Sequence, residues 1–103
     1  MAEYKEYNIR IFPAAQNDLL DIMETAGSIS PEVSARYYDS LREKFEKLTT
    51  APDTYPLARD TLLRIRGYRT LPVENYVVFY IIKGKTVELY RILCARRQYA
   101  RLL

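Results

Sequence analysis

Arginine is the residue type in this 103-residue chain whose distribution most clearly suggests a chemical role. Residues 60–103 carry nine Lys or Arg side chains against three carboxylates, and seven of the nine are Arg, whereas residues 1–59 are net acidic. The planar guanidinium group holds phosphate oxygens through two parallel hydrogen bonds, which Lys cannot form. The pattern fits an anionic partner, with nucleic acid as the first candidate, and fits equally a solvated sheet face with local salt bridges.

The absence of histidine and the single cysteine, Cys94, exclude several kinds of site. The chain alone cannot form a Cys/His zinc site, a Ser-His-Asp triad or a Cys-His dyad. We therefore expect no metal and no other cofactor, and Cys94 is expected to be a small buried hydrophobic residue. Asp60 and Tyr99 remain as candidates for a general base. Asp18 and Asp21 form a carboxylate pair that we expect to be solvated on the outside of a helix.

A strand and two helices are expected to come first in the chain. Alternating apolar residues predict a strand over Tyr4–Phe12, which Pro13 ends. Apolar residues at helical spacing then predict a helix that stops at Gly27. Ser30 and Pro31 are suited to the N-cap and the first position of a second helix. A connection of about four residues would join the two helices as an antiparallel hairpin.

The second half of the chain is expected to form three consecutive antiparallel strands after a loop over residues 52–60. They are predicted over Thr61–Val73, Tyr76–Ile82 and Thr86–Leu93, with turns at 74–75 and 83–85 and a bulge or bend at Gly67. Arg64 and Arg66 are two residues apart on the first of these strands, so they should point to one face. The last ten residues are expected to form a short helix or an ordered tail.

These elements together predict an α+β fold of two layers in a single domain over residues 1–103. An N-terminal strand and a helical hairpin precede a three-stranded antiparallel meander. The two helices can cover only one sheet face, so the other face, with its arginines, is left to solvent or a partner. The aromatic residues expected in the core are Tyr37, Tyr38, Phe45, Tyr76 and Tyr80. No apolar run can span a bilayer and no secretory signal is present, so we expect a cytoplasmic protein without membrane contact.

Motifs along most of the chain resemble the RelE/ParE superfamily of toxins from bacterial type II toxin–antitoxin modules. They are the run 15–22 in the first helix, Gly67-Tyr68-Arg69, the run 75–80, Arg91-Ile92-Leu93 and Arg96-Arg97-Gln98-Tyr99, in family order. The resemblance implies a small cytoplasmic toxin that a cognate antitoxin holds inactive. RelE-like members cut mRNA in the ribosomal A site, whereas ParE-like members poison DNA gyrase. The long helical hairpin looks more like the ParE type, and the Arg69 and Arg97–Tyr99 arrangement looks more like the RNA-cleaving type.

The resemblance also implies roles for individual residues. Arg69 would contact the scissile phosphate, Arg97 would stabilise the transition state, and Tyr99 would stack on a base or donate a proton. Cys94 stands where many relatives have His. The candidate nucleic-acid contacts are Arg64, Arg66 and Arg96, with local ion pairs as the alternative for the first two.

Three functions follow from these expectations. The leading hypothesis is a metal-independent endoribonuclease whose partners are the ribosome, mRNA and a cognate antitoxin. The alternative is a ParE-type inhibitor of DNA gyrase without nuclease activity, and the third is an inactive relative that only binds an antitoxin. An acidic, amphipathic antitoxin segment is expected to lie across the sheet or the helical layer.

Overall fold

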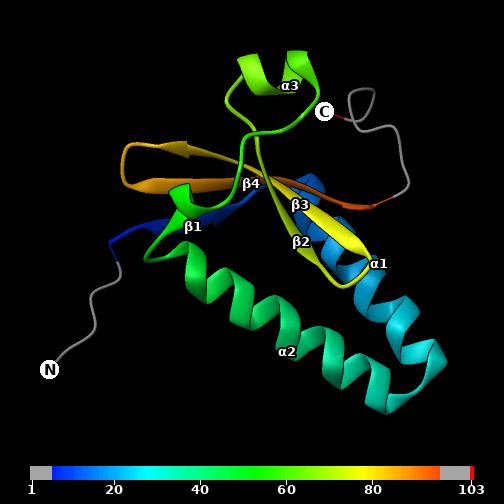
Figure 1. The fold of residues 1–103 in the computed structure, drawn as a ribbon. Coiled ribbons are helices and arrows are strands. Elements are labelled where there is room, and N and C mark those ends of the chain that lie inside the picture. The colour runs from blue at the N-terminus through cyan, green and yellow to red at the C-terminus, as the bar shows by residue number, and fades with distance from the viewer. Residues whose placement is uncertain (1–5, 96–102) are drawn as a thin grey trace, which may run out of the picture.

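The computed structural model of the protein describes residues 6–95 and residue 103. The elements are β1 (Asn8–Ile11), α1 (Pro13–Ile29), α2 (Pro31–Leu48), a 3-10 helix η1 (Pro52–Thr54), α3 (Thr61–Ile65), β2 (Arg69–Val73), β3 (Tyr76–Lys83) and β4 (Thr86–Cys94). The strands form one sheet in the order β1-β4-β3-β2. Strands β2, β3 and β4 are antiparallel neighbours, and β1 runs parallel to β4. The predicted two-layer α+β fold, with its helical hairpin and meander, is confirmed (Figure 1).

A single residue, Ser30, joins α1 to α2. Because a residue before proline is driven out of the helical region, Ser30 is extended, with φ −171° and ψ 158°. Its main-chain N–H donates to the carbonyl of Ala26, and its hydroxyl accepts from the N–H of Val33, so it caps both helices. The predicted stop at Gly27 and the four-residue connection are therefore wrong. Gly27 lies inside α1, and the helix continues to the residues before Pro31.

The main core lies between the helical hairpin and one face of the sheet. Its buried members are Ile22, Leu41, Leu48, Leu71, Val73, Val78, Tyr80, Val87, Leu89 and Ile92. Of the aromatic residues predicted for the core, Tyr80 is fully buried. The core cluster is also contacted by three half-buried aromatic residues, Tyr37, Phe45 and Tyr76. The prediction is wrong for Tyr38, which is 58% exposed. Tyr37, four residues before Leu41, takes the inward position on α2 instead.

A second, smaller apolar cluster lies on the opposite face of the sheet. Its buried members are Ala58, Leu63, Tyr68, Phe79 and Leu93. The short helix α3 lies on this side, across the sheet from α2 (Figure 1). The expectation that this face is left uncovered is therefore wrong for the part that α3 and residue 58 cover.

The helix α3 replaces the strand predicted over residues 61–66, because capping residues stand at both of its ends. The Asp60 carboxylate accepts a hydrogen bond from the N–H of Leu63 at 3.0 Å, as an N-cap does. Gly67 has φ +89°, a left-handed conformation that glycine adopts without strain. The N–H groups of Gly67 and Tyr68 donate to the carbonyls of Arg64 and Leu63, which is the Schellman pattern. Gly67 thus ends a helix and is not a strand bulge.

Candidate functional site

Of the three predicted catalytic residues, Arg69 lies in the described part of the chain. Arg97 and Tyr99, together with the predicted nucleic-acid contact Arg96, lie outside the described residues. Arg69 is the first residue of β2 and is half-buried. Its Nη1 donates to the main-chain carbonyl of Tyr55 at 2.6 Å and to that of Asp53 at 3.4 Å. The guanidinium group therefore holds the loop around η1 against the sheet.

Arg69 belongs to the face of the sheet that the helical hairpin covers. It is paired in register with Tyr80, and residues directly opposite one another on neighbouring strands share a face. Tyr80 is fully buried in the main core, and its hydroxyl donates to the carbonyl of Pro52. Burial raises the pKa of Tyr80, and the charge of Arg69 offsets part of that rise. Arg69 and Tyr80 thus act together on the main chain of residues 52–55.

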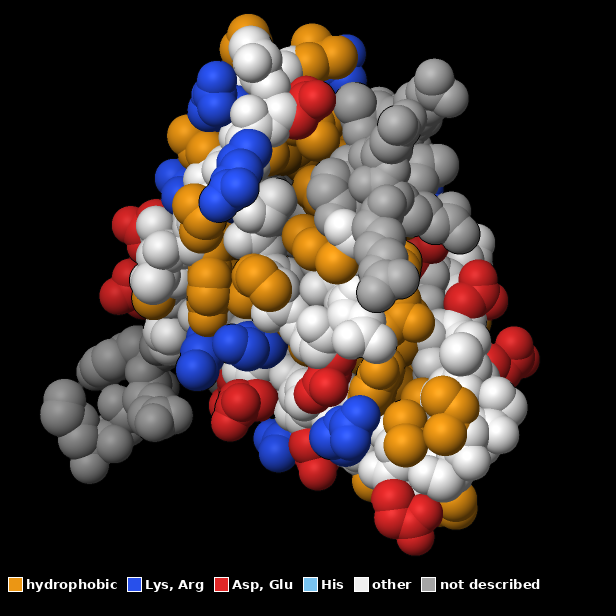
Figure 2. Space-filling model, turned by 45° about the vertical axis from the view of Figure 1, so that its right-hand side comes forward, with side chains coloured by type: hydrophobic (Ala, Val, Ile, Leu, Met, Phe, Trp, Pro, Cys, Tyr) orange, Lys and Arg blue, Asp and Glu red, His pale blue; other side chains and the backbone are white. Residues whose placement is uncertain are grey.

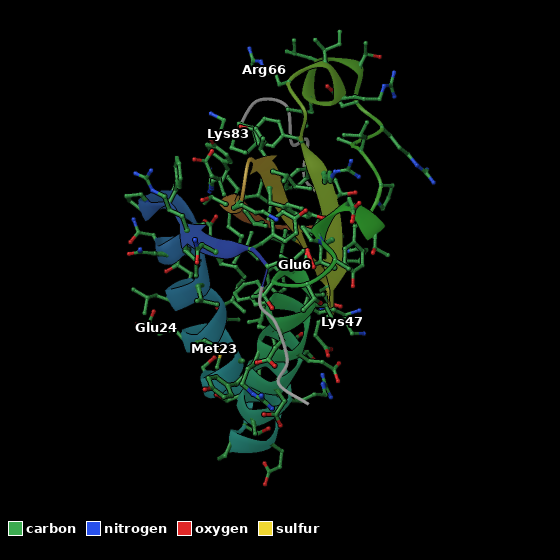
Figure 3. The ribbon with its side chains drawn as sticks, turned by 90° about the vertical axis from the view of Figure 1, so that its left-hand side faces the viewer. Glu6, Met23, Glu24, Lys47, Arg66 and Lys83 are labelled. Carbon is green, nitrogen blue, oxygen red and sulfur yellow. The ribbon has the colours of Figure 1, made fainter. Side chains whose placement is uncertain are left out.

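Arg64 and Arg66 do not join Arg69 on a strand face. Arg64 is in the last turn of α3 and Arg66 is its C-cap residue, so the predicted strand placement is wrong. Residues two apart on a helix are rotated by about 200°, so these side chains leave the helix in different directions. The Nη1 of Arg64 donates to the carbonyl of Arg59 at 3.1 Å. Figure 3 shows Arg66 at the α3 end of the molecule, away from the helical hairpin.

The sequence reasoning overlooked Glu88, a buried carboxylate on β4 that is 9% exposed. The hydroxyl of Tyr90 donates to its Oε1 at 2.7 Å, and the Nζ of Lys83 lies 3.6 Å from the same oxygen. Burial and the hydrogen bond to Glu88 raise the pKa of Tyr90 to about 12. Glu88 is paired with Ile81, which packs in the second cluster. It therefore faces away from the side of the sheet that holds Arg69.

Arg91 is neutralised by a carboxylate of its own chain. Its Nε and Nη2 donate to the two oxygens of Asp18 at 2.7 and 2.9 Å, and the N–H of Ile92 donates to Asp18 at 2.9 Å. The hydrogen bond to Asp18 raises the pKa of Arg91. The expectation that Asp18 is solvated is wrong. Asp18 lies three residues after Ala15 and four before Ile22, and both of these residues are buried. This helical spacing places Asp18 on the side of α1 that faces the sheet.

Among residues 6–95 and 103, no group of three or more His, Cys, Asp or Glu side chains is arranged to hold a metal ion. In the same part of the chain, none of the helices combines the length and the apolar character that crossing a membrane requires.

Cys94 is a free thiol at the end of β4 and is half-buried, where full burial was expected.

An apolar groove of about 470 Å³ lies between α1, α2 and β1. Two of the residues that line the groove, Leu20 and Tyr38, are 67% and 58% exposed. Figure 3 shows Met23 on the side of α1 that faces α2. The lining residues are Ile9, Leu19, Leu20, Met23, Tyr38, Leu41, Arg42, Phe45, Glu46 and Thr49. An open groove with this lining suits the apolar side chains of a partner segment.

A family model matches most of the chain, and solved structures share its fold. The family model for the ParE toxin of the type II toxin–antitoxin system parDE matches residues 9–99. No curated protein matches the sequence. The structure is similar to a chain of the chromosomal ParDE TA system from P. aeruginosa, with a TM-score of 0.70 and 20% identity, covering 88% of this chain and 98% of that one. It is also similar to a chain of the toxin–antitoxin complex RelBE2 from Mycobacterium tuberculosis, with a TM-score of 0.60, 21% identity, and 86% and 98% coverage.

Proposed function

Because the chain belongs to the ParE toxin family of type II toxin–antitoxin systems, we propose that its target is DNA gyrase, which it inhibits without cutting nucleic acid. The sequence raised this function as the alternative to mRNA cleavage. The family match favours it, and the position of Arg69 is the observation that carries it. The Nη1 of this half-buried residue donates to the carbonyls of Asp53 and Tyr55, so part of its guanidinium group is used within the fold, whereas a ribonuclease would use that group on a phosphate.

Among residues 6–95, the chemistry of RNA cleavage supports the same choice. Cleavage without a metal requires a base, a phosphate-binding cation and an acid around one phosphate. Arg69 shares the face of the sheet that the helical hairpin covers, while Glu88 faces the other side and is bound by Tyr90 and Lys83. The Oδ1 of Asp60 accepts the capping hydrogen bond from the N–H of Leu63 in α3. An inhibitor that works by binding needs no such constellation.

We further propose that a cognate antitoxin binds in the groove between α1, α2 and β1. The two similar structures are toxin–antitoxin assemblies, which supports an antitoxin as the partner. Apolar side chains of a helical or extended segment would fill the groove around Leu20 and Tyr38. The guanidinium group of Arg42 in the lining suits an acidic residue at the edge of that segment.

Expression of the toxin without its antitoxin tests the proposed target. A gyrase inhibitor should induce the DNA damage response and leave the 5′ ends of cellular mRNA unchanged. New mRNA 5′ ends at positions within ribosome-bound codons, with no DNA damage response, would reject the proposal in favour of mRNA cleavage.

A matched pair of substitutions tests the antitoxin groove. Leu20 and Ile29 are 67% and 66% exposed on α1, but only Leu20 lines the groove. Leu20→Asp should weaken antitoxin binding by about tenfold or more, because it places a charge in an apolar contact. Ile29→Asp should leave the dissociation constant within about twofold of the wild-type value. Equal effects of the two substitutions would place the antitoxin elsewhere.

A further inference from the structure

The surface around α3 combines exposed apolar side chains with arginines that form no ion pair within the described part of the chain. Leu62 and Ile65 are 50% and 76% exposed, and because they are three residues apart on a helix they share one side. Arg59, Arg64 and Arg66 are exposed, and none forms an ion pair with another described residue. We call these five residues the α3 knob. Figure 2 shows hydrophobic and Lys/Arg side chains next to one another at the end of the molecule that carries α3.

The α3 knob rests on a rigid support. Leu63, on the inward side of α3, is 1% exposed and packs with Phe79 in the second cluster. Both ends of the helix are capped, and the N–H of Ala58 donates to the carbonyl of Tyr68 at 2.8 Å, which ties the segment before α3 to the start of β2. The backbone of α3 is therefore held in place before any partner binds, so binding does not have to order the helix.

We propose that the α3 knob is the surface through which this toxin binds its target, and that the target presents an apolar pocket rimmed by carboxylates. Burial of Leu62 and Ile65 in such a pocket removes apolar area from water. The guanidinium groups of Arg59, Arg64 and Arg66, which form no ion pair with another described residue, complement carboxylates at its edge. This inference rests on the proposed function only in naming gyrase as the protein that carries the pocket.

A protein partner explains the knob better than a nucleic acid does. A phosphate backbone would engage the three arginines but would leave Leu62 and Ile65 in water. The knob also lies on the opposite side of the sheet from α2, and thus from the groove assigned to the antitoxin (Figure 1). A target on the knob and an antitoxin in the groove therefore contact different residues.

Two double variants of the 103-residue toxin separate these possibilities. Leu62→Ser with Ile65→Ser removes the apolar side chains, and Arg64→Gln with Arg66→Gln removes charge. The Leu20→Asp variant serves as the control at the groove. Each protein is assayed for growth arrest after induction, for binding to purified DNA gyrase, to its antitoxin and to a duplex DNA oligonucleotide, and for thermal unfolding.

The Ser double variant should bind gyrase about 30-fold or more weakly and lose growth arrest, with antitoxin affinity and thermal unfolding unchanged. Unchanged growth arrest in this variant would overturn the inference, and so would a loss of antitoxin affinity, which would make the knob an antitoxin contact. Loss of activity in the Gln variant alone, with salt-dependent binding to duplex DNA, would overturn it in favour of a nucleic-acid surface. If the wild-type toxin does not bind gyrase but the Ser variant still loses growth arrest, the proposed target fails while the knob survives as the target-binding surface.

Discussion

Asp18 is a polar residue on which the stability of the fold should depend strongly. It ties α1 to the centre of the sheet, because it accepts hydrogen bonds from Arg91 Nε at 2.7 Å, from Arg91 Nη2 at 2.9 Å and from the N–H of Ile92 at 2.9 Å. The substitution Asp18→Ala removes these acceptors together. It leaves a guanidinium group in a partly buried position without its carboxylate.

The expected loss of stability follows from how deeply the Arg91–Asp18 ion pair is buried. The side chains of Arg91 and Asp18 are 24% and 12% exposed, so the ion pair is neither fully solvated nor fully buried. Exposed pairs contribute about 0–1 kcal/mol, and breaking a fully buried pair costs about 3–5 kcal/mol. We therefore expect Asp18→Ala to lower the free energy of unfolding by about 2–3 kcal/mol, or the melting temperature by roughly 10–20 °C.

Urea unfolding followed by circular dichroism measures this loss. Asp21→Ala is the matched control, because Asp21 is exposed on the same helix, and its effect should stay within about 0.5 kcal/mol. Combining Asp18→Ala with Arg91→Met should recover part of the loss, since the guanidinium charge that lost the Asp18 carboxylate is removed as well. A loss below about 1 kcal/mol for Asp18→Ala, or equal losses for the two aspartates, would refute this reasoning.

The remaining predictions concern the loop, the short helix and the tyrosines. Tyr80→Phe should lower the free energy of unfolding by about 1–2 kcal/mol, because the carbonyl of Pro52 loses its buried donor; urea unfolding with no change would contradict this. Asp60→Ala and Gly67→Ala should each cost about 1 kcal/mol and speed amide hydrogen exchange in residues 61–66, and slow exchange there in both variants would count against the two caps. The raised pKa of Tyr90, about 12 against the ordinary 10.0, means that its neutral form is favoured by folding. Stability from Tyr90 should be complete below pH 10 and be lost as the pH rises towards 12, as followed by tyrosinate absorbance during unfolding, and Tyr90→Phe should make that loss shallower.

The sequence predicted the helical hairpin and the meander because their apolar periodicity is local and continuous. The short helix α3 was missed although its signals were present: Asp60 has a residue type that caps helices, and Gly67 stands where a Schellman glycine belongs. Reading Gly67 as a strand bulge placed Arg64 and Arg66 on a strand face that does not exist. The end of α1 is likewise set by Ser30, which stands before a proline, and not by Gly27.

The surroundings of the candidate residues could not be predicted in the same way. The Gly-Tyr-Arg motif located Arg69, but its partners are carbonyls of Asp53 and Tyr55, and main-chain acceptors leave no pattern in a sequence. The partners Asp18 and Arg91 are joined only by the packing of α1 on β4, far apart in the chain. The α3 knob could not be predicted from the sequence because residues 61–65 were expected to form a strand. In a strand, Leu62 and Leu63 would point to opposite faces, and no exposed apolar side of a helix would exist.

The activity of the purified toxin on purified gyrase is the most direct test of the proposed function. Relaxed plasmid, ATP and gyrase are incubated with the toxin, and translating ribosomes on a defined mRNA are incubated with the same preparation in parallel. We predict that plasmid supercoiling is blocked, that addition of the antitoxin restores it, and that the mRNA stays intact. Cleavage of the mRNA on the ribosome while supercoiling proceeds normally would contradict the proposal.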